Sequence, residues 1–131
     1  MTRRHQITMR ECMSRLPHEL EVGATVAEAS EAMTKGGFRH LPIMDGPRLF
    51  GLVTRHDLDQ LLAARGPEAA QLTVNEVCLR EVYTISPEAE LVDAVREMRR
   101  RKIGSVLVKD AGLVIGIFTS SDALRVLADL L

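Results

Sequence analysis

The chain contains an internal repeat, because its second half follows its first at a constant offset of 65 residues without a gap. Identical residues recur in both copies, and the pairs include Thr8 and Thr73, Gly51 and Gly116, Thr54 and Thr119, and Asp57 and Asp122. A repeat of this kind restricts the possible architectures more strongly than any local pattern does. Two copies are too few for a solenoid. The repeat therefore predicts two similar halves that face each other across a pseudo-twofold axis.

The repeat divides the 131 residues into a first unit, 1–66, and a second unit, 67–131, within one compact module. In each unit the apolar periodicity and the turn residues predict the order strand, helix, strand, strand and helix. The expected fold is α/β (α+β), with a small three-stranded sheet and helices on one side of it in each unit. One face of such a sheet would be bare, and pairing the two units would bury both bare faces.

Local patterns place the individual elements. In the first unit they predict a helical turn at 8–13, a helix from 26 to the glycine pair at 36–37, and strands at 40–44 and 49–54. In the second unit, Ser86-Pro87 is expected to start a helix. The apolar face of that helix is expected to carry Leu91, Val92, Val95 and Met98. Thr119 is expected to cap a final helix that runs to about Leu131.

The most specific motif in each copy is Gly, two apolar residues, Thr, two variable residues and Asp. It occurs as Gly51-Leu52-Val53-Thr54-Arg55-His56-Asp57 and as Gly116-Ile117-Phe118-Thr119-Ser120-Ser121-Asp122. One interpretation is structural, because a capping Thr and an acid in the first turn stabilise a helix N-terminus. The other is functional, because an ionised carboxylate can accept hydrogen bonds from two vicinal hydroxyl groups. The recurrence of the motif at one place in both copies favours the functional interpretation.

Each copy resembles a CBS domain, and the tandem resembles a CBS pair, or Bateman module, over about residues 8–131. The resemblance rests on Arg39-His40-Leu41-Pro42-Ile43 followed by the first Gly-to-Asp motif, which match in type and spacing. It implies a regulatory or sensor module with no catalysis of its own and no required cofactor. It also implies clefts between the two units that bind an adenosyl ligand such as AMP, ADP, ATP or S-adenosylmethionine.

The residues that would line these clefts also follow from the resemblance. One cleft would use Thr73, Ile103, Gly104, Thr119 and Asp122. The other would use Thr8, Phe38, Arg39, Thr54 and Asp57. In each cleft the Asp would accept hydrogen bonds from the ribose hydroxyls, and the Thr hydroxyl would face the ligand.

The two copies differ in charge beside the motif. Basic residues of the first unit, Arg39, His40, Arg55 and His56, stand where the second unit has Gly104, Ser105, Ser120 and Ser121. We therefore predict that a ribose binds at Asp122 and that His40 and His56, from the opposite unit, reach the phosphates. The alternative for each histidine is an exposed polar side chain without a ligand.

Several classes of function are not expected. No apolar run reaches the roughly 20 residues that a membrane span needs, and the first residues lead into no signal-peptide segment, so a cytoplasmic location is expected. No Ser/His/Asp or Cys/His set can be assembled from the spacing, so an enzyme is not expected. The histidine spacing predicts no metal site. Cys12 and Cys78 are expected to be free thiols that pack as small buried apolar residues.

Two other hypotheses stay open beside the sensor. In the first, the module is a scaffold whose clefts are empty, whose Thr-x-x-Asp motifs only cap helices and whose apolar faces serve dimerisation. In the second, Arg99-Arg100-Arg101-Lys102 docks an acidic partner or nucleic acid, although cations also suit the end of a helix. Few aromatic residues and a net charge of −1 argue against nucleic acid. The resemblance further implies a homodimer and a regulated protein that the sequence does not identify.

Overall fold

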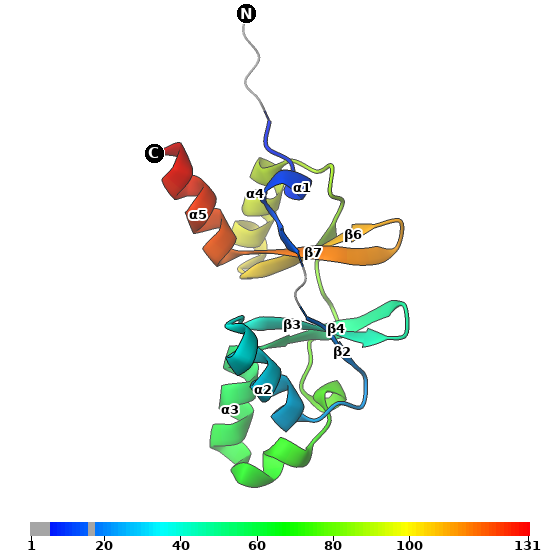
Figure 1. Ribbon diagram of the computed structural model, residues 1–131. Helices are drawn as coiled ribbons and strands as arrows, with labels where there is room; N and C mark the ends of the chain where they lie inside the picture. Colours follow the sequence, from blue (N-terminus) through cyan, green and yellow to red (C-terminus); the bar gives the residue numbers. More distant parts are fainter. Residues whose placement is uncertain (1–5, 16–17) are drawn as a thin grey trace, which may run out of the picture. The chain divides into compact units, whose positions relative to one another are not determined.

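The computed structural model describes residues 6–15 and 18–131, and it divides into two compact units (Figure 1). Unit 1 consists of Met1–Leu16 with Tyr83–Leu131, and unit 2 consists of Pro17–Val82. These units differ from the predicted boundaries of 1–66 and 67–131. The opening segment of each repeat belongs to the unit that is built mainly from the other repeat.

Unit 2 contains a three-stranded sheet in the order β2-β3-β4. Its strands are β2 (Leu20–Glu21), β3 (His40–Asp45) and β4 (Arg48–Thr54), and its helices are α2 (Val26–Gly36) and α3 (Arg55–Arg65). Two short 3-10 helices follow, η1 (Pro67–Gln71) and η2 (Val74–Glu76). Strand β3 runs parallel to β2 and antiparallel to β4. Helices α2 and α3 lie on one side of this sheet, as predicted (Figure 1).

Unit 1 contains a four-stranded sheet in the order β1-β7-β6-β5. The strands are β1 (Ser14–Arg15), β5 (Thr84–Ile85), β6 (Ser105–Asp110) and β7 (Leu113–Thr119). The helices are α1 (Met9–Cys12), α4 (Leu91–Arg101) and α5 (Ser120–Leu130). The sequence predicts three strands, and the fourth is β1, which pairs antiparallel with β7 through Ser14 and Ile117. The first repeat thus supplies a backbone partner for strand β7 of the second.

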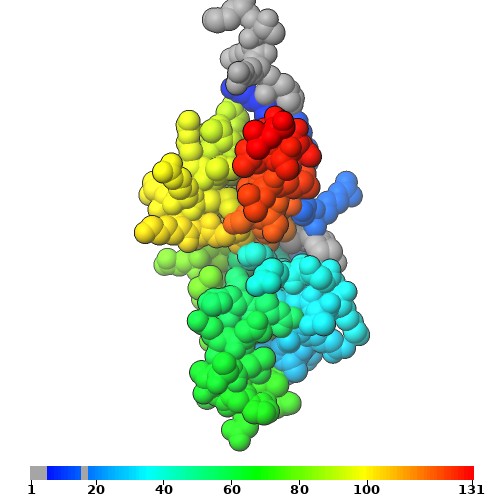
Figure 2. Space-filling model, turned by 90° about the vertical axis from the view of Figure 1, so that its left-hand side faces the viewer, coloured from blue at the N-terminus to red at the C-terminus, as the bar shows by residue number. Residues whose placement is uncertain are grey.

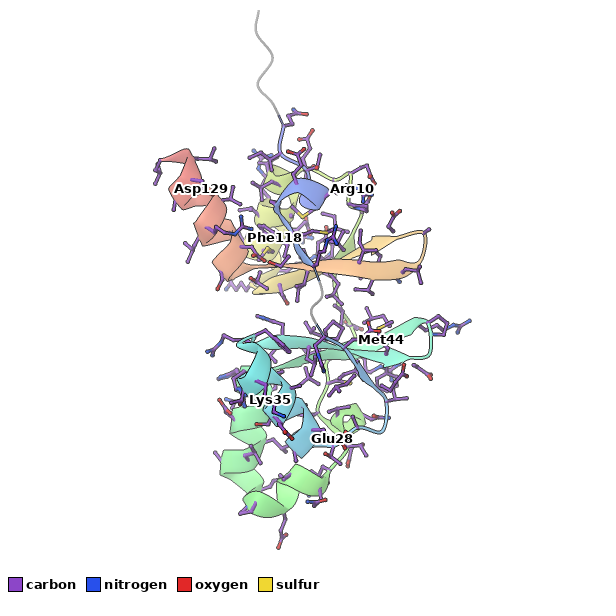
Figure 3. The ribbon with its side chains drawn as sticks, viewed as in Figure 1. Arg10, Glu28, Lys35, Met44, Phe118 and Asp129 are labelled. Atoms are coloured by element: carbon purple, nitrogen blue, oxygen red, sulfur yellow. The ribbon has the colours of Figure 1, made fainter. Side chains whose placement is uncertain are left out.

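Each unit has its own apolar core beneath its helices. In unit 1 the fully buried Phe118 lies in this core together with Met98 of α4 and Val126 of α5 (Figure 3). In unit 2 the core includes Met33 of α2 and Leu58 of α3.

The prediction for the cysteines is confirmed in part. Both are free thiols, but only Cys12 is buried, whereas Cys78 is partly exposed.

One prediction about α4 is wrong, and another is confirmed for only two of its four residues. The helix begins at Leu91 after the N-cap Glu90, whereas Pro87 lies in a turn four residues earlier. The carbonyl of Pro87 accepts a hydrogen bond from the amide of Arg10, so this turn holds the opening segment of the first repeat. Of the four residues expected on the apolar face, Met98 lies in the core of unit 1 and Leu91 packs against it, as predicted. Ala94 and Met98 are buried at the i, i+4 spacing of one helix face, and the side chains of Val92 and Val95 are exposed.

The glycine that opens each motif lies where another segment of the same unit crosses closely. A Cβ atom at Gly116 would lie 2.5 Å from Sδ of Met13 and 2.9 Å from the carbonyl oxygen of Ser14. A Cβ atom at Gly51 would lie 2.5 Å from the carbonyl oxygen of Leu79. The repeated glycine is therefore explained by packing of the crossing segment against β7 and β4.

We expect Gly116→Ala to destabilise the protein by about 1–3 kcal/mol, because the added methyl group overpacks the crossing of β1 over β7. Urea unfolding followed by circular dichroism measures this change in the free energy of unfolding. Gly104→Ala is the matched control, since a Cβ atom there meets only Oγ of Ser120, at 3.6 Å. Equal stability of the two variants would show that the crossing does not require glycine.

Candidate ligand-binding site

The first motif forms the junction between β4 and α3 in unit 2. Thr54 is the N-cap of α3, and its hydroxyl oxygen accepts a hydrogen bond of 3.1 Å from the amide of Asp57. Asp57 is partly exposed. Over residues 6–15 and 18–131, its carboxylate accepts no hydrogen bond and forms no ion pair. Both carboxylate oxygens are therefore available to hydroxyl donors.

Basic residues surround this junction. His40 of β3 pairs in register with Thr54, and the amide of Arg55 donates to the carbonyl of Arg39 over 2.8 Å. Arg39 and His56 are exposed, and His56 lies in the first turn of α3. The N-terminus of α3 adds the positive end of a helix dipole. This end of the sheet thus combines an open carboxylate with groups that favour an anion.

Arg55 has a structural role at the same place. Its guanidinium donates to the hydroxyl and the carbonyl of Ser30 and to the hydroxyl of Thr34, over 2.9–3.0 Å. Its side chain is only 18% exposed. These bonds attach the start of α3 to α2, so Arg55 is committed within unit 2.

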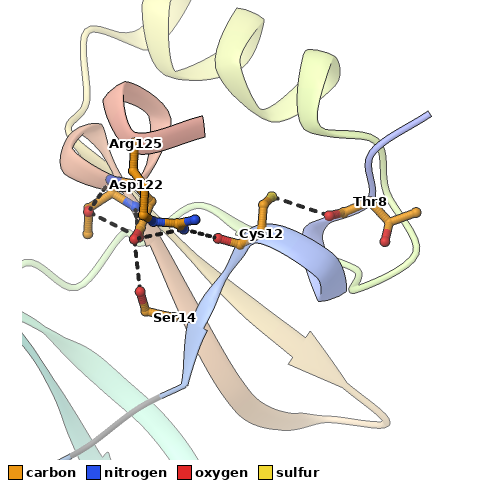
Figure 4. A network of polar contacts seen from close by, with 6 residues as sticks. Thr8, Cys12, Ser14, Asp122 and Arg125 are labelled. Atoms are coloured by element: carbon orange, nitrogen blue, oxygen red, sulfur yellow. Dashed lines mark hydrogen bonds and ion pairs between the residues drawn. The ribbon is translucent and has the colours of Figure 1, made fainter. Parts of the chain in front are cut away.

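The second motif, at the junction of β7 and α5 in unit 1, has a different environment (Figure 4). Asp122 is buried and forms a capping box, in which Oδ2 accepts from the amide of Thr119 at 2.9 Å and from its hydroxyl at 3.1 Å. Oδ1 accepts from the hydroxyl of Ser14 at 2.8 Å and forms an ion pair of 3.5 Å with Arg125. Arg125 also donates to the carbonyl of Cys12 at 2.8 Å.

The two motif carboxylates are therefore not equivalent. An ionised carboxylate offers about four acceptor positions, and four donors already surround Asp122. The predicted ribose at Asp122 would have to displace one of them. Sequence reasoning missed Ser14 and Arg125. Only Arg125 carried a signal, because it follows Asp122 at the i, i+3 spacing of neighbouring side chains on a helix.

The predicted site residues are divided between the two units. Unit 2 holds Phe38, Arg39, His40, Thr54, His56, Asp57 and Thr73. Unit 1 holds Thr8, Ile103, Gly104, Thr119 and Asp122. The prediction grouped Thr73 with Asp122 and Thr8 with Asp57, but the structure places each of these threonines in the unit of the other aspartate.

Thr8 and Thr73 both precede short helices. The amide of Thr73, the N-cap of η2, donates to the carboxylate of Glu76 over 3.3 Å. The hydroxyl of Thr8 donates to Glu11 over 3.2 Å. Both threonines thus have local structural partners.

The remaining predicted residues differ in how they are presented. Phe38 stacks near His18, with 6.1 Å between the ring centroids, and lines a pocket along α2 together with Glu28 and Lys35 (Figure 3). Gly104 is exposed, and its carbonyl accepts a hydrogen bond of 3.0 Å from the amide of Ser120. Ile103 is partly exposed and packs against the core of unit 1.

The basic run at the end of α4 is largely engaged within its own unit. Glu97 accepts hydrogen bonds from Arg100 and Arg101, which lower the pKa of its carboxyl to about 2. The guanidinium of Arg101 also lies 4.5 Å from the ring centroid of Tyr83. Lys102 is the left-handed C-cap of the helix. These contacts fit the interpretation of the run as a helix end.

Comparison with known proteins identifies the family. The family model for the CBS domain matches the chain twice, at residues 9–64 and 74–129. The chain belongs to the CBS domain family and consists of two tandem CBS domains, so the resemblance seen in the sequence is confirmed. The mixed α/β fold with two small sheets is confirmed as well.

Several solved structures share this fold. The CBS domain pair of protein MJ0100, in complex with 5′-methylthioadenosine and S-adenosyl-L-methionine, is 26% identical with a TM-score of 0.88, over 97% of this chain and 100% of that one. A Vibrio cholerae protein described as AcuB, in acetoin utilization, is 29% identical with a TM-score of 0.85, over 96% and 93% of the two chains.

A curated relative, the protein MJ1232 of Methanocaldococcus jannaschii, is 27% identical over 105 residues. The match covers 79% of this chain but 34% of that protein, so the chain spans about a third of the relative's length.

Among the described residues, no helix has the length and apolar character that a membrane span requires.

Proposed function

We propose that this chain is a regulatory module that binds an adenosyl ligand and performs no catalysis of its own. The ligand would be AMP, ADP, ATP, S-adenosylmethionine or a related nucleoside such as 5′-methylthioadenosine. The carrying observation is the carboxylate of Asp57, which is partly exposed, follows the Thr54 cap and has no partner within the described part of the chain. The ribose diol would donate to this carboxylate.

The surroundings of Asp57 support this assignment. A nucleotide carries a sugar diol and, in many cases, an anionic tail. Arg39 and His56 are exposed at the same end of the unit 2 sheet, and the α3 N-terminus favours negative charge. The carboxylate would hold the diol, and these groups would hold phosphate or another anionic substituent. His40, paired with Thr54 in the sheet, would line the same end.

The comparison with solved structures supports the ligand class. The MJ0100 pair, which matches nearly the whole of this chain, is in complex with two adenosyl compounds. A ligand regulates a partner only if it binds two states of the module with different affinity. The protein that responds to this module is not identified by the chain.

Isothermal titration calorimetry on nucleotide-free protein tests the proposal. AMP, ADP, ATP, S-adenosylmethionine and 5′-methylthioadenosine are titrated in turn, with GTP as the control for base recognition. Saturable binding of at least one adenosyl compound, with no binding of GTP, is expected. Absence of binding by the whole adenosyl panel would refute the sensor function and leave the scaffold hypothesis, in which Thr-x-x-Asp only caps helices.

We further infer that the chain forms a homodimer through an apolar surface on α4 and α5. These helices lie on the same face of unit 1 (Figure 2, yellow and orange to red). Val92 and Val95 of α4 are exposed, and α5 exposes Leu124, Leu127 and Leu130. Exposed apolar residues gathered on one surface are typical of interaction sites, and a twofold dimer uses the same patch on both copies.

Leu127→Glu is expected to convert the dimer into a monomer, because it places a charge on this apolar surface. Sedimentation velocity at a series of protein concentrations measures the change. Leu113→Glu is the matched control, since Leu113 is also exposed but lies at the start of β7, outside the surface. A wild-type chain that sediments as a monomer at every concentration would refute the dimer.

A further inference from the structure

The hydroxyl of Ser14 donates a hydrogen bond to the Asp122 carboxylate, as a sugar hydroxyl would. It donates to Oδ1 over 2.8 Å, which is an ordinary length for a hydrogen bond from a hydroxyl to a carboxylate. Ser14 lies in β1, a segment of the first repeat that pairs with β7 of the second. The chain therefore supplies its own hydroxyl donor to the second motif (Figure 4).

Other contacts hold Ser14 in this position. Arg125 donates to the carbonyl of Cys12, two residues before Ser14, while it also contacts Asp122. The thiol of Cys12 contacts the carbonyl of Thr8 at 3.2 Å. The absence of a side chain at Gly116 allows β1 to pack closely on β7. Together these contacts form a clasp, which we define as Ser14, Asp122 and Arg125.

The first motif lacks both partners of this clasp. At the repeat offset of 65 residues, Ser14 corresponds to Leu79 and Arg125 corresponds to Gln60. Leu79 contacts Leu52 in unit 2 as Ser14 contacts Ile117 in unit 1, so the backbone arrangement is repeated. A leucine side chain cannot donate a hydrogen bond, and this explains why the carboxylate of Asp57 is open.

We propose that Ser14 is an intramolecular competitor for the Asp122 carboxylate. In unit 1, a ribose diol binds only after the Ser14 hydroxyl has left, whereas the site at Asp57 binds without such a step. The inference rests on the proposed adenosyl ligand and adds its regulation. It assigns one open and one self-closed position to the two motifs, and it makes displacement of the Ser14 hydroxyl a requirement for ligand binding at Asp122.

Calorimetric stoichiometry tests this competition, with the adenosyl compound that binds wild type most tightly. Wild type is expected to bind one ligand per chain, and Ser14→Ala is expected to bind two. In Asp57→Ala combined with Ser14→Ala, one site should remain. Ser14→Thr keeps the hydroxyl and should bind one ligand. Ser86→Ala is the matched control, because Ser86 in the same unit also donates to a carboxylate, that of Glu88, at 3.2 Å.

The reverse substitutions would give the carboxylate of Asp57 the partners that Asp122 has. Leu79→Ser combined with Gln60→Arg recreates the clasp beside Asp57 and should weaken ligand binding at least tenfold. Circular dichroism confirms that each variant is folded. If wild type binds at Asp57 and Ser14→Ala still shows only one binding site, the competition is overturned but the proposed function is not. Two sites of similar affinity in wild type would also overturn it. No binding by any variant would overturn both.

Discussion

Asp57→Ala is expected to abolish the thermal stabilisation that an adenosyl ligand gives to the wild-type protein. At a ligand concentration of about 100 times Kd, binding contributes roughly 2.7 kcal/mol of stability. In a chain of this size, that raises Tm by about 5 °C or more. The substitution removes the carboxylate that would hold the ribose diol. Differential scanning fluorimetry with and without ligand measures the loss.

The unliganded stability of Asp57→Ala should change little, by about 0.3–1 kcal/mol, because the carboxylate contributes mainly through the dipole of α3. Asp59→Ala is the matched control on the same helix, since Asp59 is exposed and forms a 3.6 Å ion pair with Arg55. It should keep the full ligand shift. A ligand shift that survives in Asp57→Ala would place the ligand elsewhere.

Asp122→Ala, the same change at the matching repeat position, is expected to destabilise the protein by about 2 kcal/mol or more, because each hydrogen bond to a charged group contributes roughly 1.5–3 kcal/mol. It leaves the hydroxyl of Ser14 without its acceptor, removes the capping box of Thr119 and removes the ion pair with Arg125. The loss should exceed that of an ordinary helix cap. Urea unfolding in the absence of ligand measures it.

In Asp122→Ala, hydrogen exchange distinguishes loss of the clasp from loss of the helix cap alone. Loss of the clasp should speed exchange of the amides of β1 and of the β7 residues that pair with it. Loss of a cap alone should affect only the first turn of α5. Equal stability of Asp122→Ala and Asp57→Ala would contradict the inequivalence of the two motifs.

Much of the fold was predictable from the sequence, because the repeat and the local patterns agreed. The helix at Val26–Gly36 ends at the predicted glycine pair, and Gly37 adopts the left-handed conformation expected of a C-cap. Thr54 and Thr119 are N-caps, as both motifs predicted. Strong turn residues and apolar periodicity determine these features locally.

The exchange of the opening segments was not predictable in the same way. The pairing of β1 with β7 depends on contacts between residues about 100 positions apart, and the local sequence of Ser14–Arg15 carries no strand signal. The prediction that a helix starts at Pro87 was wrong because proline suits a turn as well as the first position of a helix. The exposed Val92 and Val95 followed the periodicity of α4 but lie off its buried face.

The difference between the two motif carboxylates was visible in the sequence only in retrospect. The identical pairs across the repeat are the residues that the two copies share, so they cannot show how the copies differ. The decisive pairs are those that differ, Ser14 with Leu79 and Arg125 with Gln60. Leu79 replaces a hydroxyl donor by an apolar side chain, and Gln60 replaces a charged guanidinium by a neutral amide. Hydrogen-bond partners across an exchanged segment require the fold before they can be assigned.

The central claim is that an adenosyl ligand binds at Asp57, and backbone amide chemical-shift mapping tests it most directly. ¹H–¹⁵N spectra of the nucleotide-free protein are recorded while the tightest-binding adenosyl compound is added. The account predicts the largest shifts at Thr54 to Asp57 and at Arg39 and His40, without comparable shifts at Thr119 to Asp122. Shifts confined to Thr119 to Asp122, or no shifts at saturating ligand, would contradict it.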